Sequence, residues 1–123
     1  GLTCDAFTSL CVDLDDDDRP VLLGVRSEGS QVPVTGMSDG TVDQLYLALR
    51  LAAIDEHIAA TAPLPLVADD LFINFDDARA AAGFRVLADL ARRSQVLFFT
   101  HHERLVKVAT DAVGQDNLSI HQL

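Results

Sequence analysis

The chain is poor in cations, and this scarcity limits what it can bind. Only nine of its 123 residues are Lys or Arg, against 19 Asp and Glu, so the formal net charge is −10 at pH 7. Lys107 is its only lysine. A broad DNA-binding surface needs clustered positive charge, which this segment lacks. Any nucleic-acid contact must come from arginines or from other parts of the protein.

Cysteines and long apolar runs are also scarce. Cys4 and Cys11 are the only cysteines, and their odd separation places them on opposite faces of one strand, which disfavours a local disulfide. No apolar run approaches the roughly 20 residues of a membrane helix, and no signal-peptide pattern opens the chain. We therefore expect reduced thiols, a cytoplasmic location and no membrane partner. The length suits a single domain over residues 1–123 with its own core.

The first third of the chain predicts β-structure. Strands are expected at residues 7–14 and 21–26, with a short third strand at 31–34. The acidic run 15–18 lacks the glycine and the distal glutamate of a calcium loop, so we interpret it as a solvated hairpin tip.

The rest of the chain alternates helices and strands. Helices are expected at residues 41–60, from Asp76 or Asp77 to Arg92 or Arg93, and at 102–109; strands are expected at 64–68, 96–99 and 118–121. The first helix shows one apolar stripe, made of Val42, Leu45, Leu49, Ala52 and Ala53. This order implies right-handed crossovers and an α/β fold, with a mainly parallel sheet flanked by helices after the N-terminal β-hairpin.

Two of the predicted strands end in polar residues. Asp69 and Asp70 follow one apolar run, and Thr100 and His101 follow another. In an open parallel sheet, ligands bind outside the carboxyl ends of the strands. Two carboxylates there suit a magnesium-phosphate site, in which one holds the hydrated metal and the other orients a water. Alternatively, they only cap the strand and solvate the turn.

A small-residue turn precedes the long helix. Ser38 and Gly40 stand where free N–H groups and the helix dipole attract an anion, although an ordinary N-cap turn has the same pattern. A lone histidine after a strand, such as His101, is usually structural. A metal site shared by His101 and His102 is disfavoured, because adjacent residues rarely point at one ion.

The order of these motifs resembles a known family. Residues 37–41 match an ABC signature motif, 66–70 a Walker B strand, 74–76 a D-loop and 97–101 a switch-histidine strand. Together they resemble the C-terminal lobe of an ABC-type ATPase head of the SMC, RecF and RecN group, and most of all the bacterial YhaN-like AAA-family ATPases. The resemblance implies a partial P-loop NTPase fold that uses ATP and Mg²⁺.

The resemblance also implies roles for individual residues. Asp69 would hold Mg²⁺ through water, and Asp70 and His101 would be catalytic, Asp70 by positioning the attacking water and His101 by sensing the γ-phosphate. The signature residues Ser38, Asp39 and Gly40 would bind ATP held by a second head in a homodimer, and Asp76 of the D-loop would act across that interface. The full-length protein would then act in DNA repair or chromosome maintenance, with DNA as a possible partner.

Three residues depart from the family pattern. Asp70 replaces the usual glutamate, which shifts the water and slows hydrolysis, although YhaN-like sequences share that aspartate. Asp39 replaces the first signature glycine and places negative charge near a phosphate, which costs energy unless a cation lies close. Met37 replaces leucine at similar volume.

No G-x-x-x-x-G-K-[ST] motif occurs in the chain, so the loop that cradles the phosphates is missing. The Q-loop and a coiled coil are missing too. We therefore expect the C-terminal lobe of a split head, with a β-hairpin region at 1–35 and the signature, Walker B, D-loop and switch-histidine motifs at 36–123. Its partner would be the missing N-terminal Walker A lobe.

Two other functions fit parts of the pattern. A metal-dependent phosphoryl-transfer or nuclease domain, similar to Toprim domains, would use Asp69, Asp70 and His101 as ligands. That function also needs a glutamate at an early strand end, for which Glu28 is the only candidate. A non-catalytic interaction module would keep the fold without the chemistry.

The missing phosphate loop leads to a first prediction. The 123-residue chain alone should bind ATP weakly or not at all and should be inactive as an ATPase. Isothermal titration calorimetry with ATP and Mg²⁺ measures this directly, and tight binding by the isolated chain would refute the assignment as a lobe without Walker A.

Overall fold

The computed structural model describes residues 7–122 of the chain. The chain forms two compact units, Gly1–Ala48 and Leu49–Leu123. The boundary between them falls inside helix α1, which runs from Asp39 to Ala60. Each unit is described by itself below.

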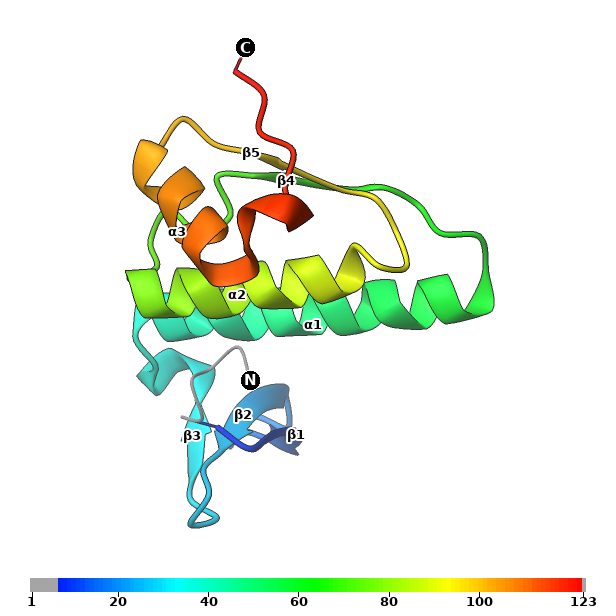
Figure 1. Cartoon of the computed structure of the whole chain (residues 1–123). Coiled ribbons are helices and arrows are strands. Elements are labelled where there is room, and N and C mark those ends of the chain that lie inside the picture. Colours follow the sequence, from blue (N-terminus) through cyan, green and yellow to red (C-terminus); the bar gives the residue numbers. More distant parts are fainter. Residues whose placement is uncertain (1–6, 123) are drawn as a thin grey trace. The chain divides into compact units, whose positions relative to one another are not determined.

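The first unit contains a three-stranded antiparallel sheet in the order β1-β2-β3 (Figure 1). Its strands are β1 (Ser9–Leu14), β2 (Pro20–Val25) and β3 (Gln31–Pro33), followed by the 3₁₀ turn η1 (Val34–Gly36). At the β1–β2 tip, the Asp15 carboxylate accepts hydrogen bonds from the backbone N–H groups of Asp17 and Arg19, each at 2.9 Å. The acidic run is therefore a self-capped hairpin tip, as predicted.

The second unit contains a parallel pair of strands, β4 (Leu66–Asp69) and β5 (Val96–Phe99), in the register Leu66↔Val96 to Asp69↔Phe99. Helix α2 (Asp77–Leu90) connects them and contacts both β5 and helix α3 (Glu103–Val113), which precedes η2 (Gln115–Asn117). Asp76 is the N-cap of α2, and its carboxylate accepts a hydrogen bond from Arg79 N–H at 2.8 Å. The predicted cap is thus confirmed.

Four phenylalanines form the centre of the core in this unit. The ring of Phe72 lies 5.4 Å from that of Phe75, 4.8 Å from that of Phe84 and 5.3 Å from that of Phe98 between centroids. Phe72 is completely buried. Gly83 of α2 makes this packing possible, because a Cβ atom there would lie only 2.5 Å from Cζ of Phe72. The cluster joins the loop after β4, helix α2 and strand β5.

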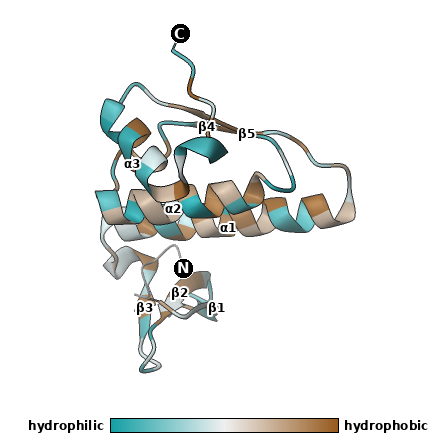
Figure 2. Cartoon of the chain, in the orientation of Figure 1, coloured by the Kyte–Doolittle hydropathy of each residue, from teal (hydrophilic) through white to brown (hydrophobic). Residues whose placement is uncertain are grey.

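The opposite face of the β4–β5 pair is bare among the described residues. Side chains alternate along each strand, so Val67, Leu97 and Phe99 share one face with Asp69. Val67 is 61% exposed, Leu97 39% and Phe99 44%. Figure 2 shows the hydrophobic colouring of these two strands. Parallel sheets are normally covered on both faces, so this face lacks a layer.

Several expectations are corrected. The sheet is not mainly parallel: the described residues form three antiparallel strands and only two parallel ones, because the alternating half supplies two strands and no neighbours for them. The expected strand at 118–121 is absent, and this segment follows η2 as irregular chain without a pairing partner in the described part. Helix α3 continues to Val113 rather than ending at Ala109.

The apolar stripe expected on α1 is correct at Leu45, which is buried, and wrong further along the helix. Leu49, Ala52 and Ala53 are exposed, whereas Leu47 and Leu51 are buried. Leucines occur at every second position from 45 to 51, so both sides of the helix are apolar and the spacing alone cannot select the buried one.

Two expectations concern thiols and membranes. Cys11 is a free thiol, and Cys4 lies outside the described residues. Within residues 7–122, no helix has the length and apolar character needed to cross a bilayer.

The fit between Gly83 and Phe72 generates a second prediction. Gly83→Val should lower the free energy of unfolding by about 1–3 kcal/mol, because the buried Phe72 ring is held on its other sides by aromatic neighbours and cannot move aside. Urea unfolding followed by circular dichroism measures the change. Ala78→Val, at an exposed position of the same helix, serves as a control and should cost less than about 1 kcal/mol. Equal costs for the two variants would contradict the packing argument.

Candidate functional site

Asp70 stands at the carboxyl edge of the parallel pair. Its backbone N–H donates to the carbonyl of Phe99 at 2.9 Å, which extends the ladder by one residue beyond β4. Its φ is +44°, in the left-handed region that aspartate adopts more readily than most residues. The strand therefore ends in a sharp turn at Asp70, next to the residues that follow β5.

Both carboxylate oxygens of Asp70 have partners from the segment after β5. The Thr100 hydroxyl donates to Oδ1 at 2.7 Å, and Nδ1 of His101 lies 2.6 Å from Oδ2. The donated hydrogen bond from Thr100 is the main reason that the pKa of Asp70 lies below its usual value. The neighbouring His101 and His102 lower this pKa further, while desolvation opposes them. Asp70 is therefore an ionised acceptor at neutral pH.

His102 completes a small cluster. It is the N-cap residue of α3, and its backbone N–H donates to the Thr100 hydroxyl oxygen at 3.2 Å. The rings of His101 and His102 lie 3.9 Å apart between centroids. One ligand atom each from Asp70, His101 and His102 falls within 4.8 Å of the others. Nε2 of His102 is buried and has no hydrogen-bond partner in the described structure.

Asp69 is placed differently from Asp70. It is exposed on the bare face of the strand pair, and within residues 7–122 its carboxylate has no hydrogen-bond or ion-pair partner. The metal-ligating group found among the described residues contains Asp70 and His101 but not Asp69. The ligand set expected for a Toprim-like site is therefore not assembled. Glu28, the further candidate, accepts hydrogen bonds from Ser27 and Ser30 in the other compact unit.

The segment predicted as a D-loop, residues 74–76, and the start of α2 are joined to helix α3 by Arg104. Arg104 donates to the Asp77 carboxylate and to the backbone carbonyl of Phe75, the latter at 3.1 Å. Asp76 is already engaged as a cap and lies 3.3 Å from Nε of Arg79. Arg104 was not predicted from the sequence, since a lone arginine in the first turn of a helix carries no local signal.

The predicted signature residues lie at the start of α1, in the first unit. The carbonyl of Ser38 accepts the N–H groups of Thr41 and Val42 at 2.9 and 3.0 Å, and its hydroxyl lies 2.9 Å from that of Thr41. Asp39 is exposed in the first turn, where a negative charge stabilises the helix. Gly40 follows within the same turn.

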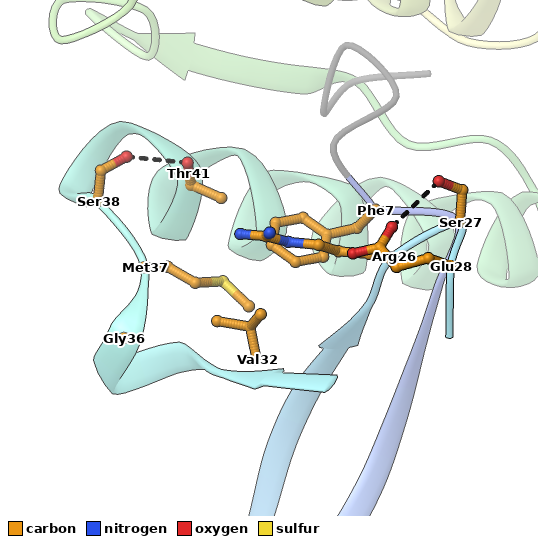
Figure 3. Close-up of a pocket in the computed structure, with 9 residues that line it drawn as sticks. All are labelled: Phe7, Arg26, Ser27, Glu28, Val32, Gly36, Met37, Ser38 and Thr41. Atoms are coloured by element: carbon orange, nitrogen blue, oxygen red, sulfur yellow. Dashed lines mark hydrogen bonds between the residues drawn. The ribbon is translucent and has the colours of Figure 1, made fainter. Parts of the chain in front are cut away.

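A pocket of about 500 Å³ opens beside Ser38 (Figure 3). Arg26 lines it, with its guanidinium carbon 6.0 Å from the centre of the Phe7 ring. Glu28 lines the same pocket, and hydrogen bonds, chiefly from Ser30, lower its pKa. Arg26 was not predicted near this turn, because only the folded sheet places it in the same pocket as Ser38. The pocket therefore combines one cation, one carboxylate and three hydroxyls, those of Ser27, Ser38 and Thr41.

Comparisons with known proteins bear on the family resemblance. No family model matches the chain. The uncharacterized protein YhaN of Bacillus subtilis (strain 168) is 34% identical over 89 residues, which make up 68% of this chain and 9% of YhaN. A solved structure from work on ATP-driven dimerization and DNA-stimulated activation of SMC ATPases superposes with a TM-score of 0.64.

That structural match covers 88% of this chain and 67% of the other chain, at 13% identity, so it establishes the fold. The first match supports the resemblance to YhaN-like proteins, and the second supports the fold of an SMC ATPase head. The resemblance inferred from the motifs is therefore confirmed, and the chain spans only about a tenth of the curated relative that it matches.

The Thr100–Asp70 hydrogen bond generates a third prediction. The folded-state pKa of Asp70 is depressed, so its ionised form stabilises the fold above the unfolded-state pKa, and this contribution is lost as pH falls through the folded-state pKa. Thr100→Val removes the largest cause of the depression, so the pKa of Asp70 should rise and the loss should begin at higher pH. Carbon-13 NMR titration of the Asp70 carboxyl group measures the change.

Thr110→Val is the matched control, because the hydroxyl of Thr110 donates to the carbonyl of Val106 within α3. It should leave the titration of Asp70 unaltered. An unchanged Asp70 pKa in Thr100→Val would show that the threonine hydroxyl does not set it.

Proposed function

We propose that this chain is the C-terminal half of an ATP-binding and ATP-hydrolysing SMC-like head domain that dimerises around ATP. One observation carries the proposal: Asp70, Thr100 and His101 meet at the carboxyl edge of the parallel strands, with contacts of 2.6 and 2.7 Å. A parallel sheet binds ligands at this edge. The match to YhaN and the SMC-like fold make a nucleotide the best-supported ligand.

In this proposal Asp70 is the acceptor that orients the attacking water. Its carboxylate is ionised at neutral pH, and Thr100 holds Oδ1, so Oδ2 is the oxygen that acts on the water. The chain alone has His101 on Oδ2. A γ-phosphate that draws the His101 ring to itself would free Oδ2 for the water. His101 would then sense the nucleotide and, by moving, make the Asp70 carboxylate available to the attacking water.

Asp69 would hold the hydrated Mg²⁺ ion. Asp69 is an exposed carboxylate with no competing partner among the described residues, and a hydrated Mg²⁺ needs only one or two protein carboxylates in addition to phosphate oxygens. When bound, Mg²⁺ would neutralise charge on the β- and γ-phosphates.

The bare face of the β4–β5 pair supports a missing lobe. Val67, Leu97 and Phe99 are apolar and exposed on strands that are normally covered on both sides. An N-terminal lobe with a Walker A loop would cover this face and supply the phosphate cradle and its lysine.

The turn at Ser38 would act on the nucleotide of a second, identical head. Ser38 and Gly40 offer a hydroxyl and a helix start, and Arg26 lines the same pocket as Ser38. Asp76 would act across the same dimer interface. The full-length protein would work in the cytoplasm in DNA repair or chromosome maintenance, and the subject of the structural neighbour's study, DNA-stimulated SMC ATPases, supports this.

The proposed role of Asp70 generates the fourth prediction. In a head assembled from this chain and a Walker A-bearing lobe, Asp70→Asn should lower ATP turnover at least about a hundredfold while ATP binding persists, because the amide cannot accept a proton. A phosphate-release assay measures turnover, and calorimetry measures binding. Asp89→Asn, which removes an exposed carboxylate from the far part of α2, should leave both unchanged. Normal turnover by Asp70→Asn would remove Asp70 from catalysis.

A further inference from the structure

The cluster after β5 contains two imidazoles, and the proposed ATP hydrolysis uses only one of them. Mg²⁺ prefers oxygen ligands, whereas imidazole nitrogens select zinc, copper, nickel and iron. His101 and His102 are adjacent in sequence, but their ring centroids are only 3.9 Å apart and both rings lie near the Asp70 carboxylate. The arrangement therefore suits a softer metal than magnesium.

We propose that Asp70, His101 and His102 bind a divalent transition metal of the zinc class, and that this metal switches off ATP hydrolysis. The binding depends only on these three side chains, while the inhibition rests on the function proposed above. Two histidines and one carboxylate leave a fourth position open, as in many zinc sites.

The distances require little rearrangement. The three ligand atoms lie within 4.8 Å of one another. A tetrahedral zinc ion with bonds of about 2.0–2.2 Å keeps its ligands about 3.3 Å apart. The contact of 2.6 Å between His101 Nδ1 and Asp70 Oδ2 would lengthen slightly to admit the ion. Ligand atoms that lie farther apart, up to 4.8 Å, would move closer together.

Thr100 preorganises the cluster. Its hydroxyl donates to Oδ1 of Asp70 and accepts the backbone N–H of His102, so one side chain fixes both ends of the ligand set. Supporting hydrogen bonds of this kind orient metal ligands. Oδ2 of Asp70 then points to the histidines and not to Thr100.

His102 provides a second, independent observation. Its Nε2 is buried and has no partner in the described structure, although buried polar atoms normally have one. A histidine kept only to cap α3 would use its side chain for that purpose, but no side-chain cap hydrogen bond is present there. The ring is therefore available for a ligand that the fold itself does not supply.

Inhibition follows from shared atoms. Zinc would occupy Oδ2 of Asp70 and a ring nitrogen of His101, the two groups assigned to the attacking water and to the γ-phosphate. The ion cannot be bound while these groups act on the nucleotide. His102 has no role in the proposed hydrolysis, so it separates the two functions.

The fifth prediction uses this separation. The 123-residue chain should bind one Zn²⁺ by calorimetry, and Co²⁺ should give the visible absorption of a tetrahedral site with nitrogen ligands. His102→Gln should weaken Zn²⁺ binding at least about tenfold, as even the loss of supporting groups does at metal sites. His121→Gln, at an exposed position in the irregular C-terminal segment, is the control and should bind normally. Circular dichroism confirms that each variant folds.

Equal Zn²⁺ affinity in His102→Gln and the unaltered chain would overturn the site. In the assembled head, micromolar Zn²⁺ should inhibit ATP turnover, and the turnover of His102→Gln, compared with its own zinc-free rate, should not respond to the same Zn²⁺ concentration. Turnover that is insensitive to Zn²⁺ despite binding would overturn the inhibitory role. A failure of the ATPase proposal looks different, because Asp70→Asn would then bind Zn²⁺ poorly yet leave turnover unchanged.

Discussion

The parallel register between β4 and β5 is the constraint on which the site depends. It aligns Asp69 with Phe99, and the next backbone hydrogen bond, from Asp70 N–H to Phe99 carbonyl, brings the two strand ends to the same level. Thr100 and His101 then reach the Asp70 carboxylate with no further adjustment. A shift of one residue would turn every side chain to the other face and separate these groups. The chemistry is therefore set by backbone pairing first and by side chains second.

Aromatic packing keeps this register in place. Phe72, from the loop after β4, stacks on Phe98 of β5. This contact fixes the turn that carries Asp70 to the neighbouring strand. Gly83 lets α2 approach the same ring closely. Asp70 keeps a left-handed backbone conformation that costs about 1–2 kcal/mol in most residues, and the surrounding core offsets it. The site thus draws on a core built from residues outside it.

Local sequence signals predicted many of the caps, turns and strands. Features that depend on pairing between distant segments were not predicted correctly. The cap at Asp76, the strand at 96–99 and the hairpin tip at Asp15 follow from neighbouring residues, and the structure has all three. The number of parallel strands depends on pairing between distant segments, which local patterns do not specify. The expected strand at 118–121 failed for the same reason. Arg26 was missed because only the fold of the sheet brings it to the Ser38 turn.

In the proposed head, the bare face of the β4–β5 pair and the unpartnered carboxylate of Asp69 have the same explanation. Asp69 shares its face with Val67 and Phe99, so the residue assigned to Mg²⁺ lies where the absent Walker A lobe would pack. The Asp70 carboxylate contacts Thr100 and His101, and both residues belong to this chain. In the proposed head, this chain would supply the water-orienting half of the site, and the Walker A lobe would complete the metal-phosphate half. At the same strand edge, the imidazoles of His101 and His102 and the Asp70 carboxylate form a ligand set that suits zinc better than magnesium.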